Sequence, residues 1–390
     1  METVINLPPE VRFGFGALDS LVPAINRLGN QRILIVTDQG VVKSGLIQPV
    51  VERLEKAGLG YTIFDKVRPN PTVFDCLTGL DIFREHGGDV LIAVGGGSPM
   101  DAAKVIQLMA THTGDVAEYD VMAGGVDKIN RHLPPMIAVP TTSGTGSEVS
   151  AGAVVTEETR NQKIVIVSPY LLPGVAIVDP EMTMGLPPNL TASTGADALT
   201  HCIEVYVSIN EEPLVEAMML FGIELCGKYL ARVVADGSDR EARKWMAFAS
   251  TVGGMGINVK GLGASHSLSH QLSTDHGIPH GLANAIMLPH VMRFNLDYAE
   301  PKYARMAVAL GAADVSSSVR DKAEKGINAV DELFSGLGLN LNLASYGVSD
   351  DSIEKMSAKA MNDPCHSGNP RPCDQALMKA MYLAALERKA

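Results

Sequence analysis

The sequence has few basic residues and no long apolar run. Its 390 residues contain 32 Lys and Arg against 44 Asp and Glu, which gives a net charge of -12. Nucleic acids and anionic membrane surfaces attract basic surfaces, so this balance argues against both as partners. No apolar run approaches the roughly 20 residues that cross a bilayer. We therefore expect no nucleic-acid partner and no membrane insertion.

Cysteine is also scarce. The five cysteines are an odd number, and no two of them form a Cys-x-x-Cys pair. This pattern argues against a disulfide framework and favours a reducing compartment. The first ten residues, Met1 to Glu10, lack the basic start and apolar run of a secretory signal. We expect a cytoplasmic protein.

Two domains are expected, because a chain of this length is long for one hydrophobic core. In the first half, short Val/Ile-rich runs alternate with amphipathic segments, which is typical of a parallel sheet covered on both faces. The predicted strands cover 32–37, 61–65, 90–94, 136–139, 164–167 and 175–178, and predicted helices cover 47–57 and 73–86. After two prolines at 187 and 188, helical periodicity dominates to the end. The sequence predicts an α/β plus all-α protein, with domains at 1–187 and 188–390.

A glycine-rich turn follows the predicted strand 90–94. Three glycines, 95–97, allow the backbone to approach a ligand closely. We predict that Ser98 caps a helix, that Pro99 is its first residue and that Asp101 is a capping carboxylate. Backbone N–H groups at a helix start favour an anion such as a pyrophosphate. A tight turn without a ligand is the alternative, because the run is not a GxGxxG fingerprint.

Two further polar positions follow predicted strands. The run 140–148 is rich in hydroxyls and glycine, and it is equally compatible with a nucleotide site and with an ordinary turn. Asp38 follows the strand 32–37, where a carboxylate can accept hydrogen bonds from a ribose 2′-OH. Its charge would repel a 2′-phosphate, so it favours NAD over NADP. A simple turn residue before Gly40 is the alternative.

Histidines gather in the second half, where five of the ten lie between 266 and 290. Asp197 and His201 are four residues apart on one helix face, and His266 and His270 repeat that spacing. His280 lies in a Pro-His-Gly turn. A lone Asp/His pair of this kind is more often a surface ion pair or a cap. One carboxylate and three imidazoles together suit a divalent first-row metal and leave a position open for a substrate.

Taken in order, these motifs resemble the iron-containing (group III) alcohol dehydrogenases over nearly the whole chain. The matching segments are 14–18, 69–72, 95–104, 140–145, 195–201, 266–281 and 369–371. The resemblance implies a dehydroquinate synthase-like architecture. Its N-terminal parallel-sheet domain, 1–187, would bind NAD, and its C-terminal helical domain, 188–390, would bind a metal. It also implies a homodimer or larger homo-oligomer.

The resemblance also implies particular site residues. The implied ligands of Fe²⁺, or of Zn²⁺, Mn²⁺ or Co²⁺ in its place, are Asp197, His201, His266 and His280. His270 matches a histidine near the metal that is a candidate proton relay. The implied cofactor-binding residues are Asp38, Asn70, Gly96, Gly97, Ser98, Asp101, Thr141, Thr142 and Lys163.

The implied activity is hydride transfer between NAD(H) and a small primary alcohol, a diol or another hydroxy compound. The product is the corresponding aldehyde, and the reaction can run in either direction. One alternative is a glycerol dehydrogenase-like or dehydroquinate synthase-like enzyme. Another is a non-catalytic protein that binds metal and nucleotide. Asp275 and His276 lie in a loop that varies in the family, and no role is assigned to them.

Overall fold

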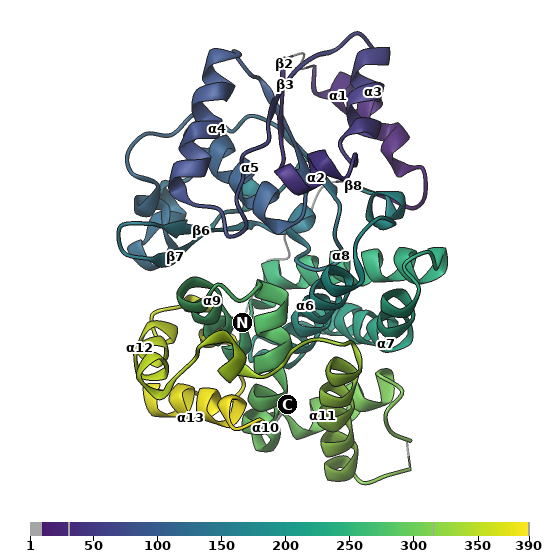
Figure 1. Ribbon diagram of the computed structural model, residues 1–390, viewed down its shortest axis with the longest axis vertical. Coiled ribbons are helices and arrows are strands. Elements are labelled where there is room, and N and C mark those ends of the chain that lie inside the picture. The colour runs from purple at the N-terminus through teal and green to yellow at the C-terminus, as the bar shows by residue number, and fades with distance from the viewer. Residues whose placement is uncertain (1–9, 30–31, 315, 389–390) are drawn as a thin grey trace. The chain divides into compact units, whose positions relative to one another are not determined.

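The computed structural model describes residues 10–29, 32–314 and 316–388 (Figure 1). The expectation about a secretory signal falls, apart from Glu10, outside the described residues. Contacts divide the chain into two compact units, one ending at Leu186 and the other beginning at Pro187. The predicted boundary lies between residues 187 and 188, and the assignment of a cofactor to one unit and a metal to the other stays a prediction. Among the described residues, no helix is long and apolar enough to cross a membrane.

The first unit is built on a six-stranded sheet with the strand order β1-β8-β5-β4-β2-β3. Every neighbouring pair is parallel, which confirms the predicted sheet. Its strands are β1 (Val11–Phe13), β2 (Arg32–Val36), β3 (Gly60–Phe64), β4 (Val90–Gly95), β5 (Met136–Pro140) and β8 (Val175–Val178). The short strand β1 was not predicted, because three residues give too little pattern.

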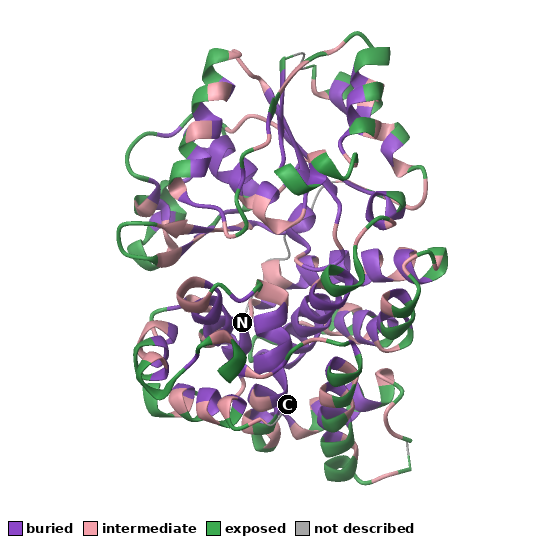
Figure 2. Ribbon diagram, in the orientation of Figure 1, coloured by how far each residue is buried: buried purple, intermediate pink, exposed green. Residues whose placement is uncertain are grey.

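Helices cover both faces of this sheet. They are α1 (Leu21–Leu28), α2 (Gln39–Lys43), α3 (Gln48–Lys56), α4 (Val73–Glu85) and α5 (Gly97–Met109). Successive strand residues point to opposite faces, so Ile33 and Ile35 pack with α1 and α3. Leu34 and Val36 pack with α4 and α5. Figure 2 shows the strands buried and the outer helical faces exposed. The Val/Ile runs are continuous because both faces are covered.

One predicted strand lies outside the parallel sheet. The run 164–167 belongs to β7 (Gln162–Val167), which pairs antiparallel with β6 (Gly152–Glu157) in a separate two-stranded sheet. The expectation that this run joins the main sheet was therefore wrong. Ile164 and Ile166 are buried while their neighbours are more exposed, an alternation that fits a strand with one covered face. The partner strand β6 was not recognised.

The second unit is helical, as the sequence predicted. Its long helices are α6 (Pro188–Val207), α7 (Pro213–Ala235), α8 (Arg240–Lys260), α9 (Ala264–His276), α10 (His280–Ala309), α11 (Val319–Gly336), α12 (Asp350–Ala360) and α13 (Gln375–Leu386). Helix α6 packs against α7, α8 and α10 and is buried along most of its length. Small residues allow this close packing, since a Cβ at Gly195 would lie 2.2 Å from Leu230 Cδ1. Asp197 and His201 are thus held inside an apolar core, which is costly unless they are paired or bind a cation.

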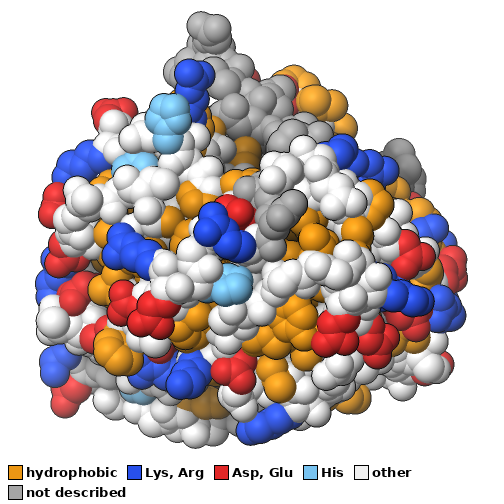
Figure 3. All heavy atoms as spheres, turned by 90° about the horizontal axis from the view of Figure 1, so that it is seen from above, with side chains coloured by type: hydrophobic (Ala, Val, Ile, Leu, Met, Phe, Trp, Pro, Cys, Tyr) orange, Lys and Arg blue, Asp and Glu red, His pale blue; other side chains and the backbone are white. Residues whose placement is uncertain are grey.

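Acidic and basic side chains are interspersed on the face drawn in Figure 3. No continuous basic surface stands out among the described residues of that face.

Candidate metal centre and cofactor turn

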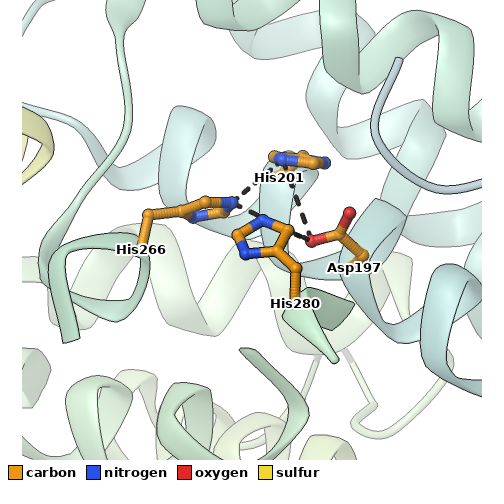
Figure 4. A group of neighbouring side chains, drawn as sticks. All are labelled: Asp197, His201, His266 and His280. Carbon is orange, nitrogen blue, oxygen red and sulfur yellow. Dashed lines mark hydrogen bonds and ion pairs between the residues drawn. The ribbon is translucent and has the colours of Figure 1, made fainter. Parts of the chain in front are cut away.

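Four side chains of the second unit point toward one another (Figure 4). Asp197 and His201 come from α6, His266 from α9, and His280 is the first residue of α10. One ligand atom from each residue lies within 4.8 Å of the other three. The Oδ1 atom of Asp197 is 3.5 Å from Nε2 of His280 and 3.9 Å from Nε2 of His201. The structure thus brings together all four predicted ligands.

Local sequence explains how three helices meet here. The four-residue spacing places Asp197 and His201 on one face of α6. Helix α10 can begin close to α6 because residue 281 is glycine. A Cβ at Gly281 would lie 2.2 Å from the backbone oxygen of Ser193. The Pro-His-Gly turn therefore brings His280 to the carboxylate of Asp197.

The donor set fits a single divalent cation. Four atoms placed tetrahedrally ~2.1 Å from a cation are separated by ~3.4 Å. The Nε2 atoms of His201 and His266 are 2.9 Å apart, and Asp197 Oδ1 lies 3.5 Å from His280 Nε2 and 3.9 Å from His266 Nε2. Asp197, His201 and His266 are almost fully buried, whereas His280 is partly exposed. A buried carboxylate beside three inward-facing imidazole nitrogens is what a first-row metal site requires.

Two neighbours of this group were missed by the sequence analysis. Glu204, also buried, lies with Oε2 2.5 Å from Nδ1 of His266. Burial lowers the pKa of His266, but Glu204, through its charge and hydrogen bond, acts together with the charges of Asp197 and Asp363 and leaves this pKa above its ordinary value. Asn284 donates from Nδ2 to Asp197 Oδ1 at 2.7 Å. Helical spacing could have indicated both, because Glu204 follows His201 by three residues and Asn284 follows His280 by four.

His270 lies beside this group and not within it. Its Nδ1 is 2.7 Å from Oδ2 of Asp363, and its ring stacks on that of His280 at a centroid distance of 5.3 Å. Asp363 also accepts hydrogen bonds from the Ser267 hydroxyl and the Cys365 backbone N–H. Burial raises the pKa of Asp363, but His270 counteracts it and the pKa lies well below its ordinary value. No pattern near Asp363 indicated this role.

The glycine turn of the first unit differs in detail from the prediction. Helix α5 begins at Gly97 with Gly96 as N-cap, so Ser98 is not the cap and Pro99 is the third helical residue. The three glycines allow the helix to begin sooner than the Ser-Pro pair suggested. Asp101 does not cap α5 either, because it accepts hydrogen bonds from the Ser147 hydroxyl and the Val154 backbone N–H. Gly96 has no side chain to cap with, which leaves the first N–H groups of α5 suited to an anion.

The two predicted turns lie against each other. A Cβ at Gly96 would be 3.2 Å from Thr142 Oγ1, and one at Gly97 would be 2.8 Å from Thr145 Cγ2. The backbone N–H of Thr141 donates to the Gly95 carbonyl at 2.9 Å. Packing alone therefore explains why residues 96 and 97 are glycine. The structure brings together Gly96, Gly97, Ser98, Thr141 and Thr142.

The remaining predicted cofactor residues lie in other parts of the first unit. Asp38 follows β2 and caps α2, with Oδ1 accepting from the N–H groups of Gly40 at 2.7 Å and Val41 at 2.9 Å. Asn70 precedes α4 with a left-handed φ of 54°. Lys163 lies in β7, where its charge acts on Asp101. The carboxyl ends of parallel strands, which Asp38 follows, are the usual place for a nucleotide.

A buried lysine that the sequence analysis passed over joins these turns. Lys104 in α5 has no exposed surface, and its Nζ donates to the Ser147 hydroxyl at 2.8 Å, the Ser150 hydroxyl at 3.1 Å and the Gly152 carbonyl at 2.7 Å. Burial lowers its pKa to about 8, and the negative charges of Asp101 and Glu148 oppose that shift. The three-residue spacing between Asp101 and Lys104 could have indicated that both side chains lie on one face of α5.

Comparison with known families decides where the chain belongs. The iron-containing alcohol dehydrogenase model matches residues 8–180, and the C-terminal model of the Fe-containing alcohol dehydrogenase family matches residues 191–386. The chain belongs to the iron-containing alcohol dehydrogenase family. The resemblance found in the sequence is thereby confirmed, and the chain is an oxidoreductase of this family.

Individual members of the iron-containing alcohol dehydrogenases are similar over almost their full length. The lactaldehyde reductase of Escherichia coli is 38% identical over 361 residues, which are 92% of this chain and 93% of that protein. The 1,3-propanediol dehydrogenase of Klebsiella pneumoniae is 38% identical over 382 residues, 97% of this chain and 98% of that protein.

Solved structures of the family share the fold. A 1,3-propanediol oxidoreductase has a TM-score of 0.95 and 38% identity, over 99% of this chain and 100% of that one. The sulfoacetaldehyde reductase of Bifidobacterium kashiwanohense, in complex with NAD⁺, has a TM-score of 0.88 and 29% identity, over the whole of both chains. The predicted fold class is confirmed.

Proposed function

We propose that this chain is a metal-dependent, NAD(H)-linked oxidoreductase that interconverts a small primary alcohol and its aldehyde. The observation that carries the proposal is the buried convergence of Asp197, His201, His266 and His280 in the second unit. The names of the relatives, which include a lactaldehyde reductase and a 1,3-propanediol dehydrogenase, support the substrate class. A homodimer or larger homo-oligomer is part of the same proposal.

Asp197, His201, His266 and His280 would hold one divalent cation. Fe²⁺ is favoured by the family, and imidazole with carboxylate also suits Zn²⁺, Mn²⁺ or Co²⁺. When bound, the cation supplies a Lewis acid for the oxygen of the alcohol or aldehyde. The chain itself holds one carboxylate and three imidazoles in fixed positions, and their burial largely excludes water.

His270 would move the proton that the reaction releases or consumes. An Nδ1–H that donates to Asp363 makes Nε2 the basic nitrogen of the ring. The lowered pKa of Asp363 keeps its carboxylate charged, so this orientation is maintained at neutral pH. The stacking of His270 on His280 keeps the relay next to the ligand group.

The first unit would bind the dinucleotide. The first N–H groups of α5, at Gly97 and Ser98, suit its pyrophosphate. Asp38, at the end of β2, suits the ribose hydroxyls of NAD. The further candidates for lining the cofactor are Asn70, Gly96, Asp101, Thr141, Thr142 and Lys163. Support comes from the family and from one structural neighbour that is described in complex with NAD⁺.

The test is a metal-reconstitution assay with NADH and short neutral and acidic aldehydes. Wild-type protein stripped with a chelator should regain NADH oxidation when Fe²⁺, Zn²⁺, Mn²⁺ or Co²⁺ is added. His266→Ala should lose both metal retention and turnover, with kcat/KM falling by ~10³-fold or more, since a Lewis acid lowers the barrier by several kcal/mol. His290→Gln is the matched control, because His290 lies outside the ligand group. Full activity of His266→Ala without bound metal would refute the assignment.

A further inference from the structure

Glu204 is placed on the same face of α6 as two of the four proposed ligands. It follows Asp197 by seven residues and His201 by three, so the three side chains lie in one row along the helix. Only 4% of Glu204 is exposed. Within an apolar core, a carboxylate with so little contact with water needs partners for its charge.

Both oxygens of this carboxylate have partners on α9. Oε2 lies 2.5 Å from Nδ1 of His266, and Oε1 accepts the backbone N–H of Ser265 at 2.7 Å. These contacts fall in the first turn of α9, where unpaired N–H groups favour a negative charge. Glu204 therefore fixes the start of α9 and the ring of His266 together.

The hydrogen bond decides which nitrogen of His266 faces the other ligands. A proton on Nδ1 donates to Glu204, so Nε2 carries the lone pair. That Nε2 atom points into the ligand group, 2.9 Å from Nε2 of His201 and 3.9 Å from Oδ1 of Asp197. The opposite tautomer would place a proton where a cation must bind.

The loop before α9 leaves room for this carboxylate. Gly263 has an extended backbone, with φ −135° and ψ −164°, which any residue can adopt. Its small size is needed for another reason, because a Cβ there would lie 2.7 Å from Glu204 Oε1. A larger residue at position 263 would therefore overlap with the carboxylate of Glu204.

We propose that Glu204 is a positioning residue of the metal centre, which holds Nδ1–H of His266 so that Nε2 is presented to the cation. This inference rests on the metal binding proposed above. A carboxylate behind a ligating imidazole fixes the ring and makes it a stronger donor, and loss of such a partner weakens metal binding by ~10–100-fold.

Two variants disturb this contact in different ways. Glu204→Gln keeps the size, but a single amide oxygen faces two N–H donors, Ser265 N and His266 Nδ1. The amide NH₂ then competes for Nδ1 and favours the wrong tautomer of His266. Gly263→Ala changes no charged group, but its methyl displaces the carboxylate. Glu216→Gln and Gly336→Ala are the matched controls: Glu216 pairs with Lys260 and Lys302 elsewhere in the unit, and a Cβ at Gly336 has nothing within 4 Å.

The measurement is the affinity of full-length protein for Zn²⁺ and Co²⁺, in competition with a chromophoric chelator at fixed pH. We expect Glu204→Gln to bind both metals ~10–100-fold more weakly than wild type. Gly263→Ala should also bind them more weakly, and both controls should bind them like wild type. The visible absorption of the Co²⁺ form should change in both test variants, since the ligand field depends on His266. A merely structural role would lower the melting temperature without changing that spectrum.

Each outcome is decisive. Wild-type affinity and an unchanged Co²⁺ spectrum in both folded test variants would overturn the role of Glu204 and leave the proposed function intact. If Glu204→Gln does not fold, Gly263→Ala decides alone. Failure of the wild-type protein to bind either metal would overturn the proposed function, and this inference with it.

Discussion

Asp38 illustrates how one side chain can serve both the fold and a ligand. One oxygen of its carboxylate caps α2 through Gly40 and Val41, while its position after β2 suits a ribose. Replacement by glycine would remove both roles at once. An asparagine caps a helix about as well as an aspartate but carries no charge. The substitution Asp38→Asn therefore separates the two roles.

We expect Asp38→Asn to raise the ratio of kcat/KM for NADPH over that for NADH by about tenfold, which corresponds to 1.4 kcal/mol less repulsion of a 2′-phosphate. The free energy of unfolding should change by less than ~0.5 kcal/mol, because the cap is kept. Asp115→Asn is the control, since Asp115 also caps a short helix through its side chain. An unchanged cofactor ratio would show that Asp38 serves only as a cap.

The residues of the candidate metal centre differ in how well the sequence predicts them. Asp197, His201, His266 and His280 could be predicted, because helical spacing and an unusual residue type coincide. Glu204 and Asn284 have the spacing but belong to common types, and only the structure shows that they face inward. Asp363 reaches His270 from a distant segment, so only tertiary folding brings the two together.

At the scale of elements, the start of α5 is held to the β5–β6 connection by one buried network. Asp101 and Lys104 lie on the same face of α5 and both contact the hydroxyl of Ser147. Lys104 adds hydrogen bonds to Ser150 and Gly152. These hydrogen bonds therefore link the helix that follows the glycine turn to the segment that follows the Thr141–Thr142 turn.

We expect Lys104→Met to lower the free energy of unfolding by ~3 kcal/mol, since it removes the cation that faces Asp101 and takes a donor from the buried hydroxyls of Ser147 and Ser150. Methionine matches the length of the lysine stem, so loss of packing contributes little. Urea denaturation followed by circular dichroism measures the change. Lys128→Met, at an exposed lysine that lies 3.8 Å from Glu118, should change it by less than ~0.5 kcal/mol. A loss for Lys104→Met as small as that of the control would contradict this account.

The predicted elements were right where burial on both faces produces a continuous apolar run. They were wrong where two different arrangements give the same local sequence pattern. The central strands β2, β4 and β5 are covered on both faces, so their apolar runs could not be mistaken. The run in β7 has the same composition, but its pairing with β6 depends on which segment lies beside it. The observed start of α5 differs from the predicted start, because three glycines permit a turn that side-chain preferences do not predict.

At the scale of the whole molecule, the two units have separate hydrophobic cores. The first unit buries one cluster on each face of its sheet, and the second buries a single cluster among its helices. The only tryptophan, Trp245, lies in α8 and packs near Tyr229 and Phe248, at centroid distances of 6.4 Å and 6.2 Å. Its fluorescence therefore reports on the helical unit, which contains all four proposed metal ligands.

A cation that binds only the folded helical unit must stabilise it by mass action. With free metal at 1,000 times its Kd, the gain is about 4 kcal/mol, which should raise the melting temperature seen by Trp245 fluorescence by several degrees. A chelator should reverse the rise, and His266→Ala should show none. Amide hydrogen exchange supplies the second readout: α6 and α9 should become better protected with Zn²⁺, whereas β4 and β5 should gain much less, because their protection comes from the core of the other unit. Equal gains in the sheet strands and in α6 would show that the metal stabilises the chain as a single cooperative unit.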